Sequence, residues 1–229
     1  MRARSNADGR QRHLRLSAEG GAAFAPPDEA SRREVGGLLG RLSEAQQRGL
    51  LSAMGTIEQA LGAAAAPAVE EVVLRPHRPG DMGWVVHRHG ALYAEEYGWD
   101  ERFEALVAEI VAQFVQHYEP ARERCWIAER AGETVGSVFL VQQSAEIAKL
   151  RLLLVEPGAR GGGIGARLVE QCERFAREAG YRKIVLWTNS NLHAARHIYR
   201  KAGYRLVAEE RHHSFGHDLV GETWELVLG

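Results

Sequence analysis

Residues 159–168 read ARGGGIGARL, and they stand between the apolar run LRLLLVEPG (150–158) and the helix-like run VEQCERFAREAG (169–180). A strand that turns directly into a helix exposes the first backbone N–H groups of that helix, and the helix dipole makes the site positive. Glycines remove side chains there and let an anion approach the backbone, while Arg160 adds a full charge. The stretch therefore indicates a phosphate or pyrophosphate cradle, with a glycine-rich turn that binds nothing as the alternative.

Two familiar phosphate-binding loops do not fit this stretch. A Walker loop needs Gly-Lys followed by Ser or Thr, and Ala166-Arg167 stands there instead. A dinucleotide-binding loop opens its βαβ unit with G-x-G-x-x-G, which differs from the spacing here, and the order of predicted strands is also different.

The segments around the loop predict a mixed α/β sheet. Apolar patterning and turn residues mark the elements. A helix or loop is expected at 79–99, and two strands joined by a tight Gly132-Glu133 turn are expected within 125–142. The other expected strands are 71–76, 148–157, 183–187, 204–207 and 223–228, and the other expected helices are 101–118, 164–179 and 191–201.

Two motifs resemble those of the GNAT acyl-coenzyme A transferases. Residues 160–165, RGGGIG, match the family's R/Q-x-x-G-x-G/A motif and follow a strand that ends in Val155-x-Pro157. Residues 197–204, HIYRKAGY, resemble the family's Y-x-x-x-G-F/Y segment. The likeness covers about 71–229, and it implies the GNAT fold: a mixed sheet that splays open and is flanked by helices.

The resemblance implies a site for acetyl-CoA as cosubstrate and no metal. The pyrophosphate would lie on the backbone of the glycine loop, and the pantetheine arm would run along the strand that ends at Val155. One departure is that relatives carry an Asn seven residues before the motif tyrosine, where this chain has Leu192, so Asn191 or Asn189 is the substitute candidate. The coenzyme-binding residues implied are Leu154, Val155, Arg160, Gly161, Gly162, Gly163, Ile164, Gly165 and Asn191.

Catalytic roles follow from the chemistry of acetyl transfer to an amine, which needs a polarised carbonyl, a proton for the leaving thiolate and a base. Free amides near Leu154 and Val155 can polarise the carbonyl. Tyr199 matches the family's acid, with core packing as its alternative. Glu156 is the candidate base, with a solvated loop acid as its alternative.

Two other groups of side chains have a functional and a structural interpretation. The segment HHSFGHD (212–218) could supply a histidine base or a metal ligand, and the plainer interpretation is a hairpin loop with hydrogen-bonded histidines. An aromatic-rich segment could line the acceptor site or fill the core beneath a helix. Its members are Trp84, His87, His89, Tyr93, Tyr97 and Trp99.

The N-terminal part resembles a different family. Residues 4–20 are similar to the wing of MarR-type winged-helix regulators, D-x-R…L-x-L-T-x-x-G, with Ser17 in place of Thr. The alternative for Arg2–Arg15 is a solvated, disordered basic tail. An amphipathic segment at 31–62, with a capping box at Ser31 and Glu34, resembles the MarR dimerisation helix. The helix-turn-helix that reads DNA would lie before residue 1. We therefore expect a MarR-like remnant at 1–66, a GNAT domain at 70–229, possible homodimers through the helix, and weak or no specific DNA binding.

Composition and charge exclude several classes of protein. A net charge of −1 gives no global bias towards nucleic acid, and no run of about 18 apolar residues predicts a membrane span. With Cys125 and Cys172 in apolar segments, a disulfide framework is not expected and the cytoplasm fits. From the GNAT resemblance we predict an acetyl-CoA-dependent N-acetyltransferase whose acceptor is an amine of a small molecule, an amino acid or a protein. The alternative is a regulator whose GNAT domain senses acyl-CoA.

Overall fold

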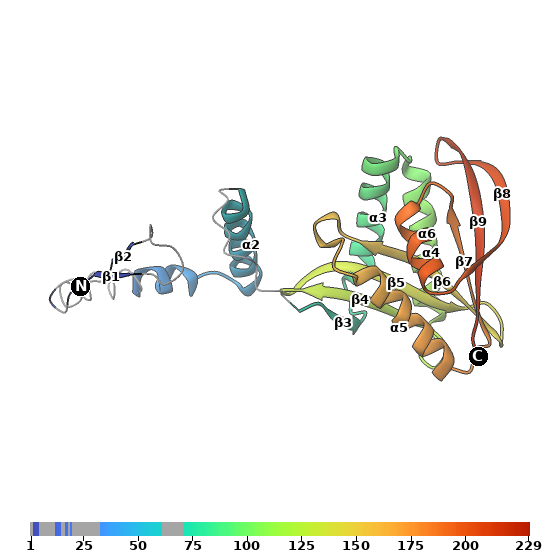
Figure 1. Ribbon diagram of the computed structural model, residues 1–229, viewed down its shortest axis with the longest axis horizontal. Helices are drawn as coiled ribbons and strands as arrows, with labels where there is room; N and C mark the ends of the chain where they lie inside the picture. Colours follow the sequence, from blue (N-terminus) through green and yellow to red (C-terminus); the bar gives the residue numbers. More distant parts are fainter. Residues whose placement is uncertain (1, 5–11, 15–16, 18, 20–32, 61–70) are drawn as a thin grey trace. The chain divides into compact units, whose positions relative to one another are not determined.

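The computed structural model describes residues 2–4, 12–14, 17, 19, 33–60 and 71–229 (Figure 1). The chain divides into two compact units, Met1–Ala68 and Val69–Gly229.

In the first unit, a small hairpin precedes helical segments. Strand β1 (Arg2–Arg4) pairs antiparallel with β2 (Arg12–Leu14). Residues 33–39 are helical, and α2 (Glu44–Ala60) follows after an interruption. Ser43 explains the new start, because its hydroxyl accepts from the Gln46 N–H and the Gln46 side chain accepts from the Ser43 N–H. This is a capping box; the one predicted at Ser31 lies partly outside the described residues.

The second unit contains a seven-stranded mixed sheet in the order β3-β4-β5-β6-β7-β9-β8. Only β6 and β7 pair in parallel. The strands are β3 (Val73–Pro76), β4 (Arg124–Arg130), β5 (Glu133–Gln142), β6 (Ile147–Val155), β7 (Lys183–Asn189), β8 (Arg205–Ser214) and β9 (His217–Val227). The helices are α3 (Asp81–Tyr97), α4 (Glu101–His117), η1 (Pro157–Ala159), α5 (Ile164–Glu178) and α6 (His193–Lys201).

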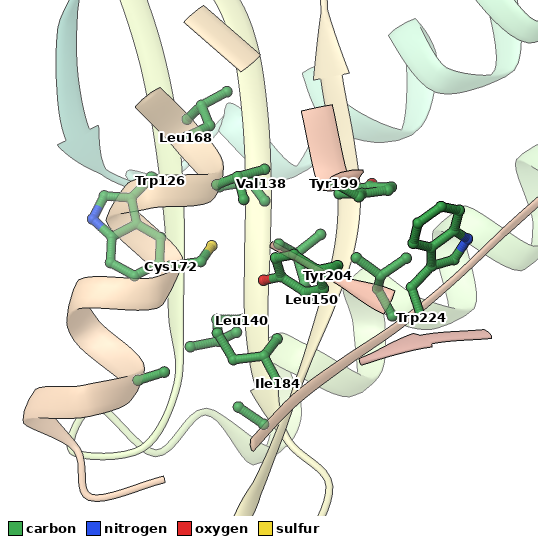
Figure 2. Close-up of a cluster of buried hydrophobic side chains, with 14 of the residues drawn as sticks. Trp126, Val138, Leu140, Leu150, Leu168, Cys172, Ile184, Tyr199, Tyr204 and Trp224 are labelled. Atoms are coloured by element: carbon green, nitrogen blue, oxygen red, sulfur yellow. The ribbon is translucent and has the colours of Figure 1, made fainter. Parts of the chain in front are cut away.

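Each face of the sheet has its own hydrophobic cluster, because alternate residues of a strand point to opposite faces. Trp126 of β4 packs with Leu168 and Cys172 of α5 in one cluster, and Figure 2 shows these side chains together with Tyr199 and Tyr204. The next residue, Ile127, packs in the other cluster with the side chains of α3 and α4. Helix α5 therefore covers one face, and α3 and α4 cover the other (Figure 1).

The sheet opens between β6 and β7. Their pairing runs from Ile147 opposite Lys183 to Leu150 opposite Leu186 and then stops, although both strands continue. On the other side of β6, the register with β5 shifts between Ser137 and Phe139. Leu152, near this bulge, has a φ of 51°. The last residues of β6 therefore keep an edge that is unpaired towards β7, as the resemblance implied.

Two sequence predictions need correction in detail, and the helix expected as one alternative at 79–99 is confirmed. The hairpin between β4 and β5 turns through Ala131 and Gly132, both with positive φ, instead of Gly132-Glu133. The segment at 79–99 is predominantly helix α3. The last hairpin is much longer than predicted, because strand pairing continues to Ser214 and His217 and only Phe215-Gly216 form the turn. The residues HHSFGHD are thus strand ends and a tight turn rather than a loop.

Candidate active site

The glycine loop joins η1 to α5 and leaves the start of α5 without a side-chain cap. Gly163 is the N-cap residue, with a φ of 76° and no side-chain cap hydrogen bond. A Cβ at Gly161 or Gly163 would meet no atom within 4 Å. The first N–H groups of a helix need partners from elsewhere, so this loop fits an anion that contacts the backbone.

A cavity of about 970 Å³ lies against this loop, and we call it the glycine-loop cavity. Its walls come from the end of α3, the end of β6, the start of α5 and helix α6. The size fits an extended cofactor, because ligand sites are commonly about 300–1,000 Å³. Among the predicted coenzyme residues, its lining includes Leu154, Val155, Arg160, Gly161, Gly163, Ile164 and Gly165.

Two predicted coenzyme residues, Gly162 and Asn191, are not in this lining. The Oδ1 of Asn191 is buried without a hydrogen-bond partner in the described structure. Gly165 lines the cavity, but a Cβ there would lie 2.7 Å from Cδ1 of Ile198. Gly165 therefore also allows α5 and α6 to pack closely.

Arg160 lies at the mouth of the glycine-loop cavity and is held from two sides. Its Nε donates to the Val155 carbonyl at 3.1 Å, and its guanidinium forms an ion pair with Glu96 of α3 at 2.7 Å. The Arg160 side chain remains 45% exposed. It is thus positioned over the loop and still accessible to an anion.

A second, smaller cavity of about 200 Å³ lies where β6 and β7 separate, and we call it the aromatic cavity. Tyr93, Trp99, Phe103 and Trp187 contribute rings to its lining. Four residues line both cavities, so the two cavities meet at the opening of the sheet; they are Tyr93, Leu153, Leu192 and Ala195. Tyr93 is the one among them with a side chain that can transfer a proton.

Tyr199 lines the aromatic cavity and also belongs to the core. It is 4% exposed and packs against Tyr204, with ring centroids 5.8 Å apart (Figure 2). Burial raises the pKa of Tyr199 well above its usual value, with smaller contributions from Tyr93 and Cys172. A raised pKa keeps the hydroxyl protonated, which an acid requires. The structure is thus compatible with both interpretations of this residue, and its role as the acid stays a prediction.

Glu156 is bound by an arginine and lines neither cavity. Nε and Nη2 of Arg88 on α3 donate to its two carboxylate oxygens at 2.6 and 2.8 Å. Such a two-pronged pair holds a carboxylate in one position. The role of Glu156 as base stays a prediction, and this placement does not favour it.

His89 is the residue of the aromatic segment whose chemistry the sequence did not single out. It is 1% exposed, and it lines the aromatic cavity. Its Nδ1 donates to the Val85 carbonyl at 2.8 Å, since a carbonyl can only accept, while Nε2 has no partner in the described structure. Burial lowers the pKa of His89 to about 4. The ring is therefore neutral, with a lone pair on Nε2.

The histidines of the HHSFGHD segment form structural hydrogen bonds. His212 Nε2 donates to Asn189 Oδ1 at 2.9 Å, and His217 bonds the Gly98 carbonyl at the same distance. His213 pairs with Asp218 across the hairpin. Asn189, one substitute candidate for the coenzyme, lines the aromatic cavity instead. Within the described ranges, no group of three or more His, Cys, Asp or Glu side chains could hold a metal ion.

Comparison with known proteins agrees with this geometry. The model of the acetyltransferase (GNAT) family matches residues 88–204, just over half of the chain. Spermidine N(1)-acetyltransferase of Escherichia coli (strain K12) is 26% identical over 155 residues, which cover 65% of this chain and 81% of that protein. IAA acetyltransferase of Azospirillum brasilense is 34% identical over 82 residues, which cover 35% of this chain and 54% of that protein.

Solved structures show the same fold at low identity. The Salmonella typhimurium protein yncA, solved with its cofactor acetyl-CoA, has a TM-score of 0.58 at 16% identity, covering 69% of this chain and 94% of that one. Spermidine N-acetyltransferase from Vibrio cholerae, in complex with CoA and spermine, has a TM-score of 0.55 at 18% identity, covering 69% and 95%. The chain therefore belongs to the GNAT acetyltransferase family and is an N-acetyltransferase that uses acetyl-CoA.

Proposed function

We propose that acetyl-CoA occupies the glycine-loop cavity and that a small amine enters the aromatic cavity, so that the acetyl group is transferred where the two cavities meet. The observation that carries this proposal is the end of β6–β7 pairing at Leu150 and Leu186, because it opens the sheet at the residues shared by both cavities. Acetyl-CoA supplies the acetyl group as a thioester.

The glycine loop and the end of β6 hold the coenzyme in this proposal. The first N–H groups of α5 and the Arg160 guanidinium bind the pyrophosphate. The unpaired edge of β6 at Leu154 and Val155 pairs with the amide groups of the pantetheine arm, as an added strand does. A free N–H on the same edge polarises the thioester carbonyl.

The transfer needs two proton movements. The amine nitrogen attacks the carbonyl carbon, a C–N bond forms and the C–S bond breaks. The Tyr199 hydroxyl donates its proton to the departing sulfur, with Tyr93 as the competing donor because it lines both cavities. His89 Nε2 accepts the proton that leaves the amine nitrogen and passes it to solvent, and Tyr199 regains a proton from solvent before the next turnover. The neutral state of His89 makes the lone pair available at pH 7.

Calorimetric titration tests coenzyme binding directly. We expect acetyl-CoA and desulfo-coenzyme A to bind with similar affinity, since both carry the pyrophosphate. Adenosine 3′,5′-bisphosphate, which lacks it, should bind much more weakly. Equal binding of all three would contradict the role of the glycine loop.

For the N-terminal unit, we infer a MarR-like hairpin and a helix through which two copies associate. Supporting this inference, the helical residues carry large apolar side chains on their surface, and contiguous exposed apolar surface marks association sites. These side chains include Val35, Leu38, Leu50, Leu51, Met54 and Ile57. Deleting residues 1–66 should convert a dimer into a monomer in light scattering while coenzyme binding persists; a monomeric full chain would contradict the inference.

A further inference from the structure

We propose that the acceptor amine carries a carboxylate, which Lys149 and Arg151 bind in the aromatic cavity. This inference rests on the proposed function, because it assigns the acceptor to that cavity. It makes the acceptor a small amino acid or a similar amine with an acidic end, and it sets this chain apart from relatives named for polyamines.

The first observation is the position of the two cations. Lys149 and Arg151 are two residues apart on β6, so they point to the same face of the sheet at a spacing of about 7 Å. Arg151 stands opposite Phe139, which packs in the cluster beneath α3 and α4. Both cations line the aromatic cavity. They therefore lie on the α3–α4 face, beside the point where β6 and β7 separate.

The second observation is the absence of a matching negative charge. No Asp or Glu is among the described residues that line the aromatic cavity. No ion pair or side-chain hydrogen bond joins Lys149 or Arg151 to another group in the described part of the chain. The charge of Glu109 on α4 raises the pKa of Arg151, but Glu109 is exposed and forms no ion pair with Arg151 in the described residues. Burial lowers the pKa of both Lys149 and Arg151, as expected for cations that have no ion-pair partner.

The third observation is the polarity of the neighbouring groups. Asn189 lines the cavity, and its Oδ1 already accepts a hydrogen bond from His212. Its amide nitrogen is therefore the atom available to a ligand, and that nitrogen can only donate. Partly buried cations without a counterion favour an anionic ligand, and charged hydrogen bonds are stronger than neutral ones. A polyamine would add like charges here, whereas a carboxylate would neutralise the site.

The fourth observation is that the cavity has a cationic side and a neutral side. His89 and Tyr199 also line it and carry no formal charge at neutral pH, as the lowered pKa of His89 and the raised pKa of Tyr199 require. The carboxylate can therefore lie at the cationic side while the amine is presented to His89. The cavity volume of about 200 Å³ matches a small acceptor.

Matched amines test the proposal. We would measure thiol release from acetyl-CoA with three pairs that differ by one carboxylate: phenylalanine and phenethylamine, lysine and cadaverine, 4-aminobutyrate and propylamine. Spermidine completes the panel. For at least one pair, kcat/KM should favour the carboxylate member by about tenfold or more, the value expected for a charged hydrogen bond. Preference for cadaverine and spermidine over every carboxylate member would overturn the proposal.

Variants show whether these two side chains cause the preference. Lys149→Gln and Arg151→Gln should each reduce it about tenfold by raising KM for the carboxylate member, with little change for the member that lacks it. Arg151→Glu should reverse the preference towards cadaverine. Arg205→Gln is the matched control, because Arg205 is an exposed cation on β8 outside both cavities. Equal losses for both members of a pair would mean a structural role and would overturn the proposal.

A binding measurement separates this proposal from the proposed function. The complex of the chain with coenzyme A would be titrated with the same amino acids by calorimetry, which needs no turnover. Binding that depends on Lys149 and Arg151 but leads to no acetyl transfer would support the carboxylate site and contradict the transfer. Acetyl transfer to amines without any binding of the carboxylate-bearing probes would support the proposed function and contradict the carboxylate site.

Discussion

Arg88 on α3 and Glu156, directly after β6, form a two-pronged ion pair, with N–O distances of 2.6 and 2.8 Å. The two side chains are 27% and 20% exposed. The pair joins α3 to the segment that leads into the glycine loop. Glu156 thus has a structural function that its place after a strand did not reveal, and the assignment of the base becomes a question between Glu156 and His89.

Glu156→Gln should therefore mainly lower stability, whereas His89→Gln should mainly lower kcat. Glu156→Gln weakens a partly exposed ion pair, so we expect a loss of about 1 kcal/mol in the free energy of unfolding and kcat within a few-fold of the wild type. His89→Gln removes the proton acceptor and should lower kcat about 100-fold. Rate profiles against pH for both variants are the measurement. A 100-fold loss in Glu156→Gln with His89→Gln unaffected would restore Glu156 as the base.

The glycine loop predicts an effect on coenzyme affinity. Gly163→Ala places a side chain at a φ of 76° at the start of α5, a conformation that costs a residue with a side chain about 1–3 kcal/mol. We expect acetyl-CoA to bind about tenfold more weakly in calorimetry. Gly158→Ala is the matched control, because Gly158 lies in η1, outside the cavity lining, and a Cβ there also meets no atom within 4 Å. Unchanged affinity in Gly163→Ala would contradict the phosphate cradle.

Tyr199 and Tyr93 can be compared through the loss of one oxygen atom each. If Tyr199 protonates the leaving thiolate, Tyr199→Phe lowers kcat about 100-fold and leaves coenzyme affinity nearly unchanged. Tyr93→Phe should then have a small effect. The opposite ranking would assign the acid to Tyr93, and full activity in Tyr199→Phe would leave this tyrosine with a role in core packing alone.

Burial of His89 predicts a dependence of stability on pH. The pKa of His89 is about 4 in the fold and near 6.5 in the unfolded chain. Between these values the unfolded state binds more protons, so the free energy of unfolding falls as pH drops from about 6.5 to 4. The difference corresponds to about 3 kcal/mol at most. Urea unfolding of His89→Leu should show a flatter pH profile than the wild type, whereas the control His87→Leu, on the exposed side of α3, should keep the wild-type slope.

The fold followed from local sequence signals, and the site followed only in part. Glycine spacing and the helical stripe after it located the loop and α5, because close approach and periodicity are properties of neighbouring residues. The partner of Glu156 was not predictable, since Arg88 lies 68 residues earlier. The cationic side of the aromatic cavity was also missed. Lys149 and Arg151 lie in a strand whose sequence is mostly apolar. Their lack of an ion-pair partner depends on where the pairing of β6 with β7 ends, which the sequence does not show.

The central claim is that acetyl-CoA in the glycine-loop cavity donates its acetyl group to an amine in the aromatic cavity. The most direct measurement combines thiol release with mass spectrometry of the amine panel after incubation with acetyl-CoA. We predict one acetylated amine for each coenzyme A thiol released, and a decrease of about 100-fold in both rates in Tyr199→Phe. Thiol release without an acetylated amine, or tight acetyl-CoA binding with neither signal for any amine, would contradict the account.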